Sequence, residues 1–89
     1  MILNWLDYFK SLITVYLNKR KIERFIRDVE IFSAGKIVIK SFPNGYQINI
    51  KGISLPNVSK EVSYREFVEI ITRQLAYRNL SHLLQGVKI

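Results

Sequence analysis

The chain has 89 residues and a mass of 10.5 kDa, which is the size of one small domain spanning residues 1–89. Hydrophobic residues make up 48% and charged residues 24%, which excludes a disordered or collagen-like chain. The absence of Cys excludes disulfides, Cys-ligated metals and thiol nucleophiles. Fourteen Lys and Arg against seven Asp and Glu give a net charge of +7, which favours an anionic partner.

Residues 2–17 predict an amphipathic helix, because their apolar side chains recur at i, i+3, i+4 and i+7. The apolar stripe consists of Ile2, Trp5, Leu6, Phe9, Leu12, Ile13 and Tyr16. A transmembrane helix would need about 20 mostly apolar residues, and Thr14 breaks this run too early. A signal peptide is not expected either, since no Lys or Arg precedes the apolar residues. We therefore expect a soluble, cytoplasmic protein without a transmembrane segment.

From Lys19 onward the apolar positions change phase. A second helical stripe is rotated by roughly 150° from the first on the same helical wheel. Its members are Ile22, Phe25, Ile26 and Val29. One straight helix cannot turn both stripes toward one small core, so either the chain bends near Asn18-Lys19 or the first stripe contacts a second molecule. The second alternative predicts a homo-oligomer with an interface formed by Trp5, Phe9, Leu12 and Tyr16.

Between the two terminal parts of the chain the apolar period drops to two, which is the period of β-strands. We predict strands at residues 29–32, 36–40 and 46–51, with a tight connection at Ser33-Ala34-Gly35. Alternating strands joined by short turns favour an antiparallel meander.

The turn between the second and third predicted strands is Phe42-Pro43-Asn44-Gly45. Proline presets its own φ angle, and we expect Gly45 to adopt a left-handed backbone. A four-residue loop sets the register, because it turns the isoleucines of both strands to one apolar face. The predicted pairs are Ile39 with Ile48 and Ile37 with Ile50, and Tyr46 is expected on this core side.

The C-terminal part predicts a loop at residues 52–60 and then a helix. Ser63 and Glu66 form a capping box, in which the Ser hydroxyl accepts from the Glu amide and the Glu carboxylate reaches back. Gly86 is expected to end the helical segment. The side chains expected on the core side of the helix are Phe67, Val68, Ile71 and Leu75.

These elements predict a two-layer α+β fold, a three-stranded antiparallel meander flanked by N- and C-terminal helices in the order α(α)βββα(α). The order of helix, three strands and helix is similar to that of the double-stranded-RNA-binding domain. That family's basic pattern at the start of its last helix is missing, since Ser63-Tyr64-Arg65-Glu66 offers one cation. The resemblance covers topology and assigns no site residue.

The sequence offers little chemistry for catalysis. The sole His, His82, has no second His or Cys to act with. Glu66 and Glu69 could serve as an acid–base pair, but helix capping explains the first and a pair with Arg73 the second. No His, Asp and Glu cluster has metal-ligand spacing. We therefore expect no enzyme activity, no catalytic residue, no metal and no cofactor.

Basic residues form the main predicted site. Residues 19–28 contain five cations and two anions, and i, i+4 pairing would leave the cluster Lys19-Arg20-Lys21 uncompensated. The polar face of the predicted hairpin adds further Lys residues beside Gln47 and Asn49. Such cations on neighbouring elements can contact a phosphate backbone. The predicted contacts are Lys19, Arg20, Lys21, Arg24, Lys36, Lys40 and Lys51.

The leading functional prediction is therefore a small, basic, non-enzymatic module that binds nucleic acid through its phosphates, with no base reading assigned. The alternative is a protein-interaction adaptor or small inhibitor, which would use its N-terminal aromatic helix or its basic face against an acidic protein partner. A weaker alternative is association of the N-terminal helix with a membrane surface. Its Trp and Phe suit this role, but its polar face carries little Lys or Arg.

Overall fold

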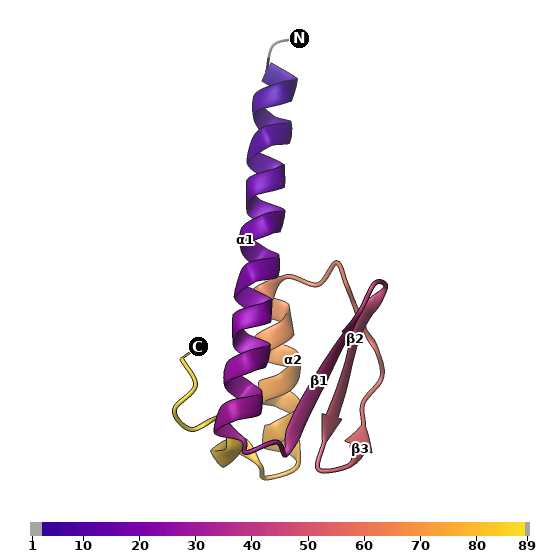
Figure 1. Ribbon diagram of the computed structural model, residues 1–89, viewed down its shortest axis with the longest axis vertical. Coiled ribbons are helices and arrows are strands. Elements are labelled where there is room, and N and C mark those ends of the chain that lie inside the picture. The colour runs from indigo at the N-terminus through magenta and orange to yellow at the C-terminus, as the bar shows by residue number, and fades with distance from the viewer. Residues whose placement is uncertain (1–2, 89) are drawn as a thin grey trace.

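The computed structural model describes residues 3–88, with side chains from residue 9 onward. Two helices flank the strands of an antiparallel sheet, so the predicted α+β fold class is confirmed (Figure 1). The molecule is elongated, measuring 52 × 25 × 20 Å. Its elements in chain order are α1 (Leu3–Phe32), β1 (Ile37–Phe42), β2 (Gly45–Ile50), β3 (Ile53–Ser54), β4 (Val58–Ser59), α2 (Tyr64–Tyr77) and a short 3-10 helix, η1 (Ser81–Leu84).

The hairpin of β1 and β2 has the predicted register. Both predicted pairs are present, Ile39 with Ile48 and Ile37 with Ile50. These isoleucines and Tyr46 are buried, which confirms the predicted core face of the sheet. The ladder runs on to Phe42 and Gly45, so the turn itself is only Pro43-Asn44.

Gly45 is required for a different reason from the one predicted. Gly45 does not have a positive φ angle. The glycines of the described chain that do have one are Gly35, Gly52 and Gly86. Instead, a Cβ atom at Gly45 would lie 2.5 Å from the carbonyl oxygen of Val58. Strand β4 pairs with β2 at this point, and only glycine permits so close an approach.

The predicted strand at residues 29–32 is wrong, because α1 continues through all four residues. Val29 lies on the same helical face as Phe25, and both side chains are buried. Burial of that face outweighs the strand preference of its β-branched residues. After α1 ends, the chain turns toward β1 at Ala34 and Gly35, which have left-handed φ angles of 54° and 80°.

The predicted loop at residues 52–60 contains two short strands instead. Strand β3 pairs with the end of β2, and β4 pairs with its beginning. Two-residue strands carry too little alternation to be predicted from sequence. Together they place residues 53–59 along the edge of the sheet opposite β1.

Helix α2 begins at the predicted cap, with one difference. The amide of Glu66 donates to Ser63 Oγ at 3.1 Å, but the Glu66 carboxylate accepts from the Ser63 hydroxyl at 3.0 Å. The amide of Tyr64 donates to Oδ1 of Asn18 at 2.5 Å, and Asn18 Nδ2 donates to the carbonyl of Val62 at 3.1 Å. A side chain of α1 thus completes the cap of α2. The predicted core residues Phe67, Val68, Ile71 and Leu75 are all buried.

The core lies between the sheet and the two helices. Its centre is aromatic: the ring of Phe67 lies 6.0 Å from that of Phe25 on α1 and 5.1 Å from that of Tyr46 on β2, between centroids. Among the side chains of α1 that the structure describes, the first buried one is Ile22, and residues 9–17 are all exposed. Those that join the core therefore all come from the C-terminal half of this helix.

Candidate functional site

The N-terminal half of α1 extends well beyond the rest of the molecule (Figure 1). We call residues 9–17, whose side chains are all exposed, the projecting segment. Its large apolar side chains are Phe9, Leu12, Ile13, Val15, Tyr16 and Leu17, with exposed fractions of 45–65%. No helix among the described residues is long and apolar enough to cross a membrane.

No bend occurs at Asn18-Lys19, because α1 is one unbroken helix. Asn18 marks the level at which α2 begins, since its side chain bonds both flanks of the α2 cap. At 100° per residue, the face that buries Ile22 continues through Asn18 to the polar Thr14 and Ser11. Beyond the core this face is therefore mainly polar, with the exposed Val15 beside Thr14 and Ser11, and most of the apolar side chains move to another side of the helix.

Three of the four predicted interface residues lie on the projecting segment. Phe9, Leu12 and Tyr16 have exposed fractions of 54%, 50% and 61% and share one helical face. The side chain of the fourth, Trp5, lies outside the described part of the structure. Their contact with a second copy stays a prediction.

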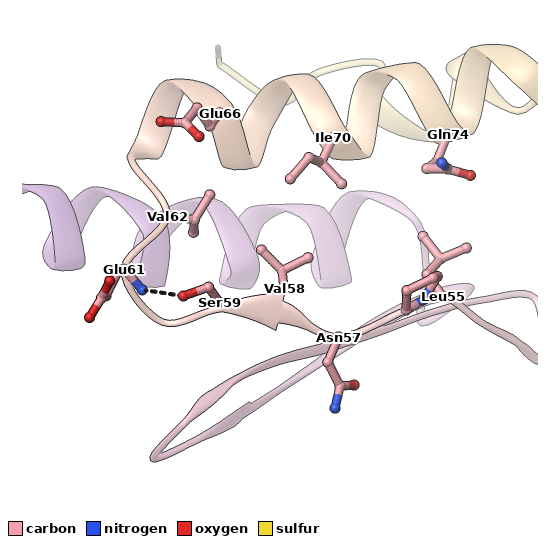
Figure 2. A pocket seen from close by; sticks show the side chains of 10 residues that line it. Leu55, Asn57, Val58, Ser59, Glu61, Val62, Glu66, Ile70 and Gln74 are labelled. Carbon is pink, nitrogen blue, oxygen red and sulfur yellow. Dashed lines mark hydrogen bonds between the residues drawn. The ribbon is translucent and has the colours of Figure 1, made fainter.

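A groove of about 560 Å³ lies between α2 and the edge segment of the sheet (Figure 2). Its apolar side chains come from both walls, with Val58 and Val62 pointing toward α2 and Ile70 pointing back toward them (Figure 2). Helix α1 is seen behind these side chains, so the groove opens on the flank of α2 away from α1. Val58 and Ile70 are only partly buried, which leaves an open apolar surface.

The rim of this groove is acidic although the protein is basic. Glu61 and Glu66 line the end near the start of α2, and Gln74 lines the other end. Both carboxylates are exposed. Sequence reasoning missed this site, because it requires the pairing of β4 with β2 and the position of α2 over that edge. The only sequence signal was the i, i+4 spacing of Glu66, Ile70 and Gln74.

The four predicted basic residues on α1, namely Lys19, Arg20, Lys21 and Arg24, are all exposed. Arg20 Nη1 donates to the hydroxyl of Tyr16 at 3.3 Å, so this cation extends the apolar stripe of the projecting segment. Lys21 Nζ lies 6.0 Å from the centroid of the Tyr64 ring at the start of α2. The structure thus places this cluster where the projecting segment meets the domain.

The three predicted basic residues of the hairpin are exposed as well. Lys40 lines a hollow of about 210 Å³ with Gln47 and Asn49, on the sheet face that the helices leave open. Lys36 and Lys51 lie together at the far end of the hairpin, where the amide of Lys51 donates to the Lys36 carbonyl at 2.8 Å. The seven predicted cations therefore form two groups, one on the helix layer and one on the sheet layer.

Asn49 and Lys60 have contacts that the sequence did not predict. The side chain of Asn49 accepts from the amide of Gly52 at 2.9 Å, so it holds a turn. Lys60 Nζ lies 4.2 Å from the centroid of the Tyr46 ring and also donates to Ser41 Oγ. Nothing in the local sequence pattern around Lys60 indicates this cation–π contact.

Titratable chemistry in the described residues is sparse. No group of three or more His, Cys, Asp or Glu side chains is placed there to hold a metal ion. Burial raises the pKa of the Tyr46 hydroxyl, and the negative charge of Glu23 raises it further. The buried polar side chain Ser33 is satisfied, since its Oγ accepts from the amide of Ile37 at 3.1 Å.

Comparison of the chain with family models, with curated proteins and with solved structures found no match in any of the three. Evidence on function therefore comes from the geometry of three surfaces. These are the projecting segment, the groove beside α2, and the two groups of basic residues.

Proposed function

We propose that the protein is a non-enzymatic binding module that docks onto a partner protein through the projecting segment of α1. One observation carries this proposal: six large apolar side chains stand on a helix that leaves the domain, each at least 45% exposed. Four of them, Phe9, Leu12, Ile13 and Tyr16, share one helical face. Isolated apolar residues on a surface are ordinary, but several on one face mark an interaction site.

The energetics favour a bound state. Full burial of one large apolar side chain is worth about 1.5–3 kcal/mol, and these side chains are already about half covered. Roughly 1 kcal/mol per side chain is thus left to gain, or several for the segment. A helical segment of this length is also marginal in water without packing, and a partner would stabilise it.

The spacing of the stripe defines the kind of surface that fits it. Phe9, Leu12 or Ile13, and Tyr16 stand at i, i+3 or i+4, and i+7, which is the pattern of a helix lying in an apolar groove. The partner would therefore present a groove or a second helix, with an acidic group near Arg20.

A photo-reactive amino acid placed at Leu12 in the full chain tests this function. The matched control carries it at Ser11, which is also exposed but lies on the polar face. We expect a discrete protein adduct from position 12, identified by mass spectrometry, and none from position 11. The variant Phe9→Glu should abolish the adduct.

Equal adducts from both positions, or no protein adduct, would contradict the proposal. A parallel sample with vesicles of anionic phospholipid addresses the membrane alternative. Binding to vesicles that is lost in Phe9→Glu, without any protein adduct, would assign the segment to a membrane surface instead.

A second candidate function is phosphate binding by the cationic groups, because all seven predicted residues are exposed in a chain of net charge +7. Affinity for a short DNA or RNA duplex would then fall with salt, and each lost contact would flatten the log–log slope by about one.

Two triple-alanine variants separate the two groups, one at Lys19, Arg20 and Lys21 and the other at Lys36, Lys40 and Lys51. The group that contacts nucleic acid should flatten the salt slope by about three when removed, and the other should leave it unchanged. Absence of binding at low salt, or wild-type slopes for both variants, would exclude this function.

A further inference from the structure

We propose that the partner is a second copy of this chain, and that each copy lays its projecting segment in the groove beside α2 of the other. This inference rests on the proposed function, since it names the partner of the same segment. Four features of the structure support it, namely length, charge, reach and symmetry.

Stripe and groove have matching lengths. Along α2 the groove is lined by Glu66, Ile70 and Gln74, which span about 12 Å at 1.5 Å per residue. From Phe9 to Tyr16 the apolar stripe covers about 10 Å on the same scale. Both consist of about two helical turns, so the stripe can contact Val58, Val62 and Ile70 along its whole length.

Charges favour one direction of docking. The groove is acidic at the end formed by Glu61 and Glu66, whereas the projecting segment ends at the cluster Lys19-Arg20-Lys21. Arg20 continues the apolar stripe, as its bond to Tyr16 shows. Docking with Tyr16 near the acidic end places opposite charges together. Their local attraction favours this orientation, although the two copies each carry a net charge of +7.

A chain cannot fill its own groove. Helix α1 is unbroken, and the bonds of Asn18 fasten it at the start of α2. The projecting segment therefore runs away from its own domain (Figure 1), while the groove runs back along α2 from Glu66 to Gln74. Only a second molecule brings a stripe to this groove.

Two-fold symmetry closes the arrangement. Helices α1 and α2 point the same way, and the groove lies on the flank of α2 away from α1 (Figures 1 and 2). A partner turned by 180° directs the start of its α2 toward the first domain, so Tyr16 meets the partner's Glu66 and Phe9 meets the partner's Gln74. This orientation is the one that the charges favour, and both contacts form at once.

Mixing two defective variants tests the exchange directly. Phe9→Glu damages the helix but keeps the groove, and Ile70→Glu damages the groove but keeps the helix. We expect wild type to sediment as a dimer. Each variant alone should raise the dissociation constant of the dimer about tenfold or more. An equimolar mixture should recover a dimer, because one intact helix meets one intact groove.

A dimer formed by packing α1 against α1 gives a different result. Ile70→Glu would then dimerise like wild type, and mixing would rescue nothing, which overturns the groove while the proposed function stands. A wild-type monomer at high micromolar concentration also overturns the inference. In that case an adduct between position 12 and another protein would still support the proposed function. If no such adduct formed, the proposed function and this inference would both be wrong.

Charge reversal provides a second test that avoids the partly buried Ile70. Arg20 and Glu61 are exposed, so Arg20→Glu and Glu61→Arg should both fold, as circular dichroism can verify. Each single variant should raise the dissociation constant of the dimer about threefold to tenfold. The double variant should bring this constant back to within about twofold of the wild-type value. A double variant that is as weak as the worse single variant would contradict this pairing.

Discussion

The two halves of α1 share one helix but have opposite environments. Residues 18–32 bury Ile22, Phe25 and Val29 against the sheet and α2, while residues 9–17 also carry large apolar side chains and bury none of them. The difference begins at Asn18, where α2 starts. An apolar stripe on a helix thus predicts that a surface will be covered, but not whether the same chain covers it.

The largest expected effect is a contrast between two matched substitutions. Ile22→Ala empties a core site that is 1% exposed and should lower the free energy of unfolding by about 2–5 kcal/mol. Ile13→Ala, at 45% exposure, should change it by less than about 0.5 kcal/mol. Both are measured by urea denaturation in the Phe9→Glu background, which removes any contribution from a partner. Equal losses would show that the projecting segment packs within the monomer.

Asn18→Ala tests the boundary between the two halves. The amide of Tyr64 and the carbonyl of Val62 would both lose a partner, so we expect a loss of about 1–2 kcal/mol. The control is Thr14→Ala, one turn earlier on the same face, whose hydroxyl bonds only within α1. If both variants unfold at the same urea concentration, the hydrogen bonds of Asn18 to the start of α2 do not contribute to the stability of the fold.

Ser63→Ala addresses the other member of that cap. Losing the bond from the Glu66 amide should cost about 1 kcal/mol. Ser11→Ala on the projecting segment is the matched control, because it makes the same chemical change on an exposed helical face. An unchanged midpoint for Ser63→Ala would mean that Asn18 alone is sufficient to cap α2.

The smallest effect concerns the loss of stability at alkaline pH that results from ionisation of Tyr46, which lies near Glu23 of the α1 half formed by residues 18–32. Burial and the charge of Glu23 raise the folded-state pKa of Tyr46, so the unfolded chain loses this proton first as pH rises. Stability should therefore be complete below the ordinary pKa of about 10 and fall above it. Tyr46→Phe should flatten that decline, and Glu23→Gln should reduce it in part. Wild-type and Tyr46→Phe curves that stay parallel above pH 10 would contradict this assignment.

Local pattern alone was enough to predict the β1–β2 hairpin with its register, the Ser63 cap and the buried face of α2. Each depends on neighbouring residues: strand alternation, a short turn, and an i, i+3 pair at a helix start. The apolar stripe of residues 2–17 and its phase change were equally visible. The sequence therefore predicted that Phe9, Leu12 and Tyr16 would be candidates for an interface.

Tertiary structure decided the rest, because it depended on contacts between distant residues. Residues 29–32 became helical since Val29 continues the buried face of Phe25, a packing term larger than strand propensity. Asn18 became a cap for a helix that starts 46 residues later in the chain. The groove beside α2 exists only because β4 pairs with β2 at Gly45, and two-residue strands leave no periodic pattern. The surfaces on which the proposed partner would dock were thus determined by long-range packing, whereas the residues that would do the docking were determined by local periodicity.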